Sequence, residues 1–226
     1  MKILKLIPFA LLSSLFAGQL FSAPDEYVKL AGKVVVTKES DMWLKATVPF
    51  VTVAHPKAQT YLKKRPTTIQ EVMNVEFLDN LKVRLYLCFS NEHQKKTLRS
   101  STLTDAQFYQ YYSAEVEYLT VQVDRNTKNA HFLFPALLAE RDGFFKGGYV
   151  KLVGYAVEIS QNDVPFEISE SIFFDKYRTE EILNKFKAQA AANSDKNRGL
   201  LMPAHLVDSS YLDATTVVKP KADAGR

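Results

Sequence analysis

Two pairs of carboxylates have the spacing best suited to acid–base chemistry. Glu115 and Glu117 are two positions apart in a run with the pattern of a β-strand, which places both side chains on one face. Glu167 and Glu170 form the second pair. Glycosidases work with two carboxyl groups, so a glycosidase is the enzyme class that this sequence comes nearest to. Carboxylates at this spacing are also typical of the solvated face of a sheet, and we expect that simpler role.

Cys88 is the only cysteine, and it lies in the run Leu-Lys-Val-Arg-Leu-Tyr-Leu-Cys-Phe-Ser at residues 81–90. A nucleophilic cysteine needs an accessible, electropositive setting and a base. No histidine lies within this run, and Tyr86 and Leu87 beside the cysteine indicate a covered side chain. We therefore expect Cys88 to pack as a small apolar residue, with an intermolecular disulfide as the alternative.

The other sequence motifs of catalysis and metal binding do not occur. The four histidines are isolated from one another and lack the spacing of metal ligands. The sequence has no Gly-x-Ser-x-Gly elbow, no glycine-rich phosphate loop and no Ser-x-x-Lys motif. We predict no catalytic residue, no metal site and no cofactor.

An aromatic run at residues 108–112 is the first candidate for binding. Thr104 and Gln107 have the spacing of a capping box, which predicts a short helix over about 105–113. On that helix Tyr109 would be free to meet a partner protein or a sugar ring, and Tyr112 is a second candidate for partner contact. Local packing is the alternative role of both tyrosines.

A basic patch and a second helix complete the binding candidates. Lys63, Lys64 and Arg65 lie together in a long loop, where they could contact acidic glycans or anionic lipid head groups or simply be solvated. Thr179 begins a helix that we expect to run to about 193. Its apolar stripe includes Ile182 and Phe186, which would pack on the sheet or on a partner.

The elements that must position these residues are mostly strands. Patterns of alternating or β-branched apolar residues predict eight of them, at 27–37, 43–53, 72–78, 81–89, 115–124, 130–134, 149–159 and 166–174. Asp79-Asn80 separates the third strand from the fourth and predicts a two-residue hairpin turn. Short strands in series with helices at the margins favour a mainly β fold. We expect an antiparallel immunoglobulin-like β-sandwich with one or two peripheral helices.

The first 22 residues have the parts of a secretory signal. Lys2 and Lys5 precede an apolar run at 6–16 that is too short to span a membrane, and small residues follow it. Cleavage is expected after Ser22, with Ala17 as an alternative. We predict one sandwich domain over 23–214, a flexible tail over 215–226 and no transmembrane segment once the signal is removed.

Composition excludes several classes of protein. Removing residues 1–22 takes away two lysines and leaves 27 basic and 25 acidic residues, so a net charge of +2 argues against nucleic-acid binding. A single cysteine excludes a scaffold of internal disulfides. Hydrophobic residues make up 46% of the chain, which is typical of a globular protein that rests on its core.

Several strand motifs together resemble a known group of proteins. Trp43 opens one strand, Phe77–Val83 leads into Tyr86, and Tyr149–Tyr155 forms a late strand. This combination resembles the small immunoglobulin-like exported proteins encoded beside type IV pilus genes in mucin-degrading gut Verrucomicrobia. The resemblance implies a sandwich in the periplasm or at the outer membrane that takes part in pilus assembly or surface display, without known catalysis. The chain lacks the Gly-Phe cleavage site and long apolar N-terminal helix of pilins, so it would be an accessory protein.

These observations predict a non-enzymatic exported protein that works through protein–protein contacts at the cell envelope. The expected partners are envelope or pilus proteins, and a second copy of the chain is a further candidate. The alternative is a glycan-binding module that uses exposed tyrosines, and a glycosidase ranks third.

Overall fold

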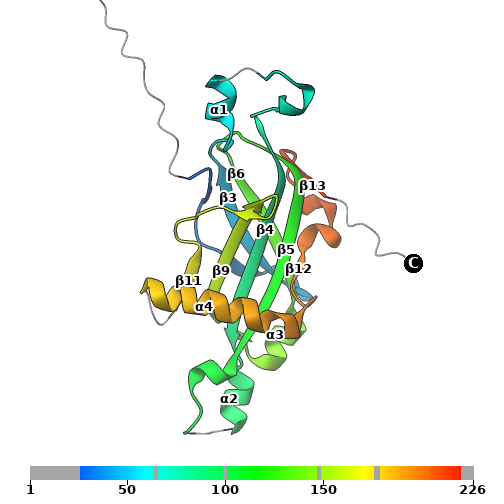
Figure 1. The fold of residues 1–226 in the computed structure, drawn as a ribbon. Helices are drawn as coiled ribbons and strands as arrows, with labels where there is room; N and C mark the ends of the chain where they lie inside the picture. The colour runs from blue at the N-terminus through cyan, green and yellow to red at the C-terminus, as the bar shows by residue number, and fades with distance from the viewer. Residues whose placement is uncertain (1–25, 64–65, 99–100, 147–148, 176–178, 220–226) are drawn as a thin grey trace, which may run out of the picture.

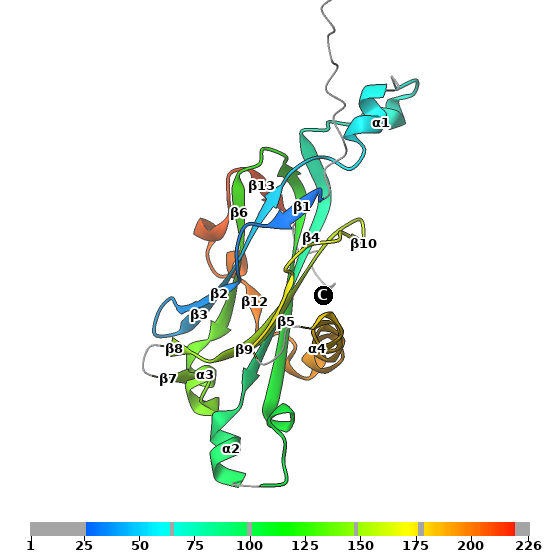
Figure 2. The ribbon, with the colours of Figure 1, turned by 90° about the vertical axis from the view of Figure 1, so that its left-hand side faces the viewer.

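Two antiparallel sheets pack against each other as the layers of a sandwich (Figures 1 and 2). The computed structural model describes residues 26–63, 66–98, 101–146, 149–175 and 179–219. The first sheet contains β1 (Val28–Leu30), β2 (Val35–Lys38), β3 (Trp43–Thr52), β6 (Thr127–Pro135) and β12 (Met202–Pro203). The second contains β4 (Phe77–Ser90), β5 (Tyr109–Gln122), β9 (Leu152–Gln161), β10 (Val164–Pro165), β11 (Ile172–Phe174) and β13 (Thr216–Val218). The prediction of a mainly β fold with antiparallel pairing is confirmed.

The core lies between the sheets and follows the period-2 pattern of the strands. In β4 the predicted inward face is confirmed, because Leu81, Val83, Leu85, Leu87 and Phe89 are fully buried. From the other layer, β3 and β6 contribute residues such as Phe50 and Phe132 to the same cluster. Burial of apolar area on this scale is the main stabilising contribution in a fold without disulfides.

The predicted hairpin at Asp79-Asn80 is wrong, because β4 runs through both residues without turning back. β5 pairs with β4 both before and after Asn80, and β9 pairs with β4 from Leu81 onward. Asn80 nevertheless has a φ of 55°, which asparagine tolerates better than most residues. Leu78 and Leu81 are both buried although they are three positions apart, so the inward face changes phase at Asn80. The turn signal marks an irregularity within one strand.

The helix predicted over 105–113 is also wrong beyond its first turn. A 3-10 turn, η2 (Asp105–Phe108), occupies the capping-box region, where Gln107 Oε1 accepts a hydrogen bond from the Thr104 amide at 2.7 Å. From Tyr109 onward the chain is in β5, whose register pairs Tyr109 with Ser90. Pairing along all of β4 outweighs the local helical signal.

Helices lie around the sandwich, and there are more of them than the one or two predicted. They are α1 (Ala58–Lys63), α2 (Glu92–Leu98), α3 (Ala136–Asp142) and α4 (Glu180–Asn193), with the 3-10 turns η1 (Ile69–Glu71), η3 (Ser194–Asn197), η4 (Ala204–Leu206) and η5 (Ser209–Tyr211). The helix predicted from Thr179 is confirmed as α4, which crosses the outer face of the second sheet (Figure 1).

Two of the predicted strands are divided or shortened. The stretch 149–159 forms β8 (Tyr149–Val150), which pairs with β7 (Phe145–Lys146), and then β9. Only Ile172–Phe174 of the stretch 166–174 is a strand. Gly154 in β9 allows β11 to pack closely against β9, since a Cβ on residue 154 would lie 2.7 Å from the Phe173 carbonyl oxygen.

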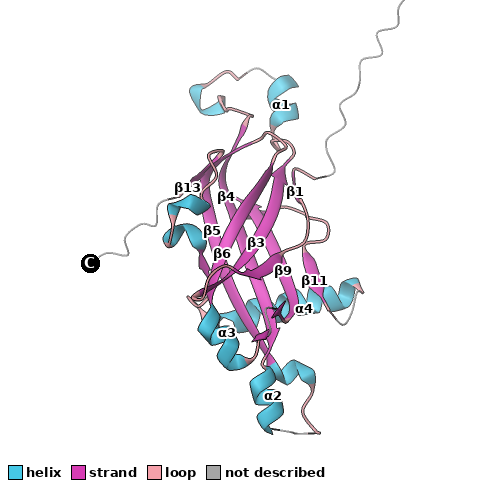
Figure 3. Cartoon of the chain, turned by 180° about the vertical axis from the view of Figure 1, so that it is seen from behind, coloured by secondary structure: helices cyan, strands magenta, loops and turns pink. Residues whose placement is uncertain are grey.

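The segment after α4 contributes a strand to each sheet (Figure 2), and Figure 3 shows the second of them, β13, at the edge of its sheet. β12 pairs with β6 in the first sheet, and β13 pairs with β5 in the second. The expectation of a flexible tail from residue 215 is therefore wrong for Thr216–Val218, whereas residues 220–226 lie outside the described part. The signal predicted at 1–22 also lies outside it. Among the residues that the structure describes, none of the helices has the length and apolarity needed to cross a bilayer.

Candidate functional site

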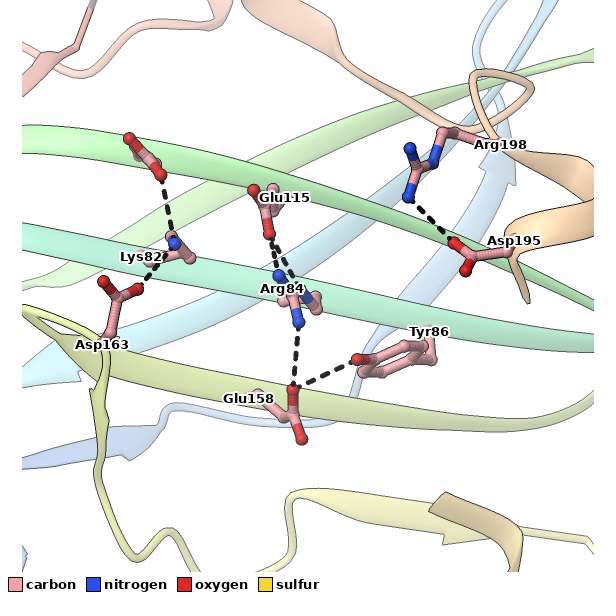
Figure 4. Close-up of polar contacts among 9 residues, drawn as sticks. Lys82, Arg84, Tyr86, Glu115, Glu158, Asp163, Asp195 and Arg198 are labelled. Atoms are coloured by element: carbon pink, nitrogen blue, oxygen red, sulfur yellow. Dashed lines mark hydrogen bonds and ion pairs between the residues drawn. The ribbon is translucent and has the colours of Figure 1, made fainter. Parts of the chain in front are cut away.

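The outer face of the second sheet is divided into two halves. The outward side chains of β4 are Lys82, Arg84, Tyr86 and Cys88 in order. The first two belong to a network of ion pairs, which we call the charged half, and the last two are buried with α4, which we call the covered half. Figure 4 shows that the charged half spans three neighbouring strands.

Arg84 joins the strands on both of its sides. Its Nε donates a hydrogen bond to Glu115 Oε2 on β5 at 2.8 Å, and its Nη1 lies 4.0 Å from Glu158 Oε2 on β9 (Figure 4). Burial is the largest single influence on the pKa of the Arg84 guanidinium and lowers it, but hydrogen bonds and charge interactions with Glu115 and Tyr86 together outweigh burial, so the pKa is raised. Glu158 also accepts a hydrogen bond from the Tyr86 hydroxyl and pairs with Lys187 of α4.

Lys82 makes a second bridge beside the first. Its Nζ lies 3.2 Å from Glu117 Oε1 on β5 and 2.8 Å from Asp163 Oδ1 in the β9–β10 turn. Lys219, directly after β13, pairs with Glu117 at 3.1 Å. Hydrogen bonds from Lys219 and Lys82 lower the pKa of the Glu117 carboxyl. These groups line a shallow cavity of about 270 Å³.

The predicted pair Glu115 and Glu117 is therefore on one face, as its spacing indicates, but each carboxylate has a cationic partner. A general acid at neutral pH needs a raised pKa, whereas that of Glu117 is lowered. The geometry suits ion-pair partners that hold strands together. Glu167 and Glu170 are exposed in the loop before β11, and neither lies in the network.

Cys88 lies in the covered half with no exposed surface. Its neighbours there are Tyr86 and Tyr111 from the sheet and Phe186 and Ala190 from α4. Burial raises the pKa of the thiol to about 12. The interpretation of Cys88 as a covered, apolar side chain agrees with this position.

Two of the predicted binding residues, Tyr112 and Phe186, are used for packing. Tyr112 is 1% exposed, and its ring lies 4.7 Å from that of Phe134 in the main core. Phe186 is 2% exposed and packs on Tyr111 and Phe174. These two residues cannot present their rings to a partner, and Ile182, one turn before Phe186 on α4, is half-buried. The strand conformation of 109–112 puts Tyr112 inward, so Tyr112 has the packing role that was the alternative to partner contact.

The basic patch is only partly described. Lys63 is exposed at the end of α1, and Lys64 and Arg65 lie outside the described residues. The exposed apolar side chains nearest to Lys63 in sequence are those of Ile69 and Val72. Nothing in the described part assembles a binding pocket around Lys63.

The structure has a groove beside Tyr109 that the sequence did not predict. It has a volume of about 550 Å³ and is lined by η2, the start of β5, Arg141 of α3 and the C-terminal end of α4 with η3. Tyr109 and Tyr111 line it together with side-chain amides such as those of Gln189 and Asn197. The lining residues are about eighty positions apart in the sequence, so no local pattern could have indicated it. A single clue was available: Tyr109 was expected to remain open to a ligand.

Comparisons of the chain with family models, with curated proteins and with solved structures found no match.

Proposed function

We propose that this chain is an exported, non-catalytic protein that binds another protein at the cell envelope, as an accessory of pilus assembly or surface display. The proposal combines the N-terminal signal pattern with the charged half, where the best candidate carboxylates are engaged in ion pairs. The periplasm or the outer membrane is the proposed location. A partner protein is preferred over a second copy of the chain.

The observation that carries the proposal is a concentration of exposed apolar side chains along one edge of the sandwich. Five of the thirteen large apolar side chains exposed in the described residues belong to β5, β13 and the turns between β12 and β13. We call them the C-terminal edge: Leu119, Leu206, Val207, Leu212 and Val217. Scattered apolar residues are ordinary on a protein surface, but a group of them on one edge marks an interaction site.

The strand at this edge favours a protein as the occupant. β13 is three residues long and is the outermost strand at this edge of the sheet. The edge therefore offers backbone N–H and C=O groups to a further strand. An extended segment of another protein can pair with such an edge while its apolar side chains cover the exposed ones. Apolar surface and strand edge together fit a polypeptide better than a small molecule.

We also propose that the sandwich is immunoglobulin-like. The neighbour order β1/β2–β3–β6 in one sheet matches strands A, B and E of that fold. The order β11–β9–β4–β5 in the other matches G, F, C and C′. In this scheme α4 and the two C-terminal strands are additions to the basic sandwich.

The C-terminal edge is tested by capture of partners from an envelope extract with the tagged mature protein. Val217→Asp places a charge on the edge and should reduce the captured partner by about tenfold, which corresponds to about 1.4 kcal/mol. Val164→Asp is the matched control, because Val164 is the same residue type, is exposed and lies in β10 at the opposite edge of the same sheet. Equal capture by both variants and the parent would contradict the proposal.

Export is tested separately by cell fractionation of the full chain and of a form without residues 1–22. The full chain should be found in the envelope fraction, shortened at its N-terminus, and the truncated form in the cytoplasm. Full-length protein retained in the cytoplasm would rule out the proposed location without bearing on the binding edge.

A further inference from the structure

We propose that the groove beside Tyr109 binds an acidic saccharide, that is, a sugar that carries a carboxylate or a sulfate group. The groove is separate from the C-terminal edge, so this proposal does not depend on the proposed protein partner. With about 550 Å³ it falls in the size range of small-molecule sites, which is about 300–1,000 Å³. Its walls come from five elements, and its polar groups therefore converge from several directions.

The floor of the groove is aromatic and held in place. Tyr111 is 7% exposed, and its ring centre lies 6.1 Å from that of Phe186 beneath it. Tyr109 is half-buried and meets Phe174 edge to face at 6.1 Å between ring centres. Tyr111 is too covered to meet a ligand, so of the two rings Tyr109 is the one that offers a sugar an apolar surface, and its packing on Phe174 keeps the cost in conformational entropy small.

The walls carry side-chain amides that have further hydrogen-bonding groups for a ligand. Gln110 Oε1 accepts a hydrogen bond from the Tyr112 hydroxyl, and Gln107 Oε1 accepts one from the Thr104 amide. These bonds fix both side chains and leave their NH2 groups as donors. From η3, Asn197 Nδ2 donates to the Tyr111 carbonyl at 2.9 Å, which leaves its oxygen as an acceptor. Fixed donors and a fixed acceptor in the lining of one groove suit the hydroxyl groups of a sugar ring.

The charge of the lining selects an anion. The lining residues include Arg141 and Lys196 but no aspartate or glutamate. Asp142, which pairs with Arg141, is 6% exposed and does not line the groove. Lys196 has no ion-pair partner among the residues that the structure describes. A neutral sugar would leave this charge unused, so a carboxylate or sulfate on the sugar is expected to add affinity.

The test measures binding of three probes to the mature protein by calorimetry. The probes are a disaccharide ending in glucuronate, the same disaccharide ending in glucose, and a sulfated form of the glucose disaccharide. At least one acidic probe should bind about tenfold more tightly than the neutral one. The two acidic probes distinguish a carboxylated from a sulfated ligand. No binding of either acidic probe up to about 10 mM, or equal binding of all three, would overturn the proposal.

A pair of lysine variants locates the binding. Lys196→Met should lower the affinity for the acidic probe about tenfold, to that of the neutral probe, and leave the neutral probe unaffected. Lys185→Met is the matched control, since Lys185 is exposed on α4 outside the groove. Equal losses in the two variants would assign the effect to overall charge and refute the site. Melting temperatures of both variants verify that the fold is kept.

A further variant tests the side-chain amides that line the groove. Gln189→Leu keeps the approximate size of an exposed side chain at the groove and removes its hydrogen-bonding groups. It should weaken both acidic and neutral probes by about fivefold, the effect of one ordinary hydrogen bond. Unchanged affinity for every probe that binds would contradict the position of the sugar in the groove.

Discussion

The charged half and the covered half of the second sheet are built from the same three strands, yet they are stabilised differently. In β4, Lys82 and Arg84 point outward within a network of ion pairs, whereas Tyr86 and Cys88 point outward into a buried cluster. The strand pairing is continuous across the boundary between the halves. What changes is the presence of α4, which places Phe186 and Ala190 over the second pair.

The boundary between the halves is itself a polar contact. The Tyr86 ring belongs to the covered half, while its hydroxyl donates to Glu158 of the charged half at 3.2 Å. Lys187 of α4 pairs with the same carboxylate. The comparison teaches that the sequence of an outward strand face changes from charged to apolar where another element will cover it. It also predicts that variants in the covered half cost more stability than variants in the charged half.

The largest effect is expected from Phe186→Ala. Phe186 is 2% exposed and stacks on Phe174, with 4.9 Å between ring centres. Removing a buried aromatic ring typically costs about 3–5 kcal/mol, because it loses contacts and leaves a cavity. The free energy of unfolding should fall by that amount in a urea titration. Ile182→Ala, one turn earlier and half-buried, should cost clearly less. Equal losses in the two variants would contradict the role given to Phe186.

The next effect concerns the reactivity of Cys88. Because the thiol is fully covered and burial raises its pKa to about 12, native protein should react with a thiol reagent at least about a hundredfold more slowly than denatured protein. Phe186→Ala should accelerate the native reaction. Rapid labelling of the unmodified native protein would contradict the buried position of Cys88 in the covered half.

The same thiol gives a pH dependence with a defined sign. Its folded pKa lies above the ordinary value of 9.0, so its contribution to stability is complete below pH 9 and is lost as the pH rises toward 12. The free energy of unfolding should therefore fall less steeply over this range in Cys88→Ala than in the parent. The pKa values of Tyr111 and Tyr118 are also raised, so both tyrosines lower the free energy of unfolding in the same direction as the pH rises. The contribution of Cys88 is therefore the difference between the slope of the parent and that of the variant.

A smaller loss is expected from Gly154→Ala. The added Cβ would lie 2.7 Å from the Phe173 carbonyl oxygen and 2.9 Å from Phe186 Cζ, closer than packed atoms approach. Overpacking of this kind costs about 1–3 kcal/mol. Chemical denaturation gives the value, and Gly32→Ala is the control, since its Cβ would meet only Pro49 at 3.8 Å. A neutral Gly154→Ala would show that α4 can move away from the sheet without loss.

The smallest effect is expected in the charged half, from Arg84→Met. Its side chain and that of Glu115 are 40% and 39% exposed, so water and salt screen the pair and the loss should be about 0.5–1 kcal/mol. The loss should shrink further in high salt. Arg198→Met, which breaks an exposed pair with Asp195, should be close to neutral. A loss from Arg84→Met as large as that from Phe186→Ala would reverse the comparison.

The candidate sites were predictable only in part. The period-2 pattern correctly placed Glu115 and Glu117 on one face, and the covered position of Cys88 followed from its neighbours. The pattern could not indicate which cations would pair with Glu117, because Lys219 reaches it from β13, about a hundred residues later. The groove beside Tyr109 was missed for the same reason, since Gln189 and Asn197 come to it with α4 and η3.

The sequence by itself determined the mainly β class, the inward face of β4 and the residue range of α4, because the alternation of apolar residues and the apolar stripe of a helix are local properties of the chain. Only the tertiary structure decided the conformation of residues 109–112, where pairing with β4 replaced a helix after one turn. It also made Asn80 an irregularity within a strand instead of a hairpin turn. Local signals specify which conformations are available, and contacts between distant residues select among them because each added strand pairing contributes more than a turn or cap can.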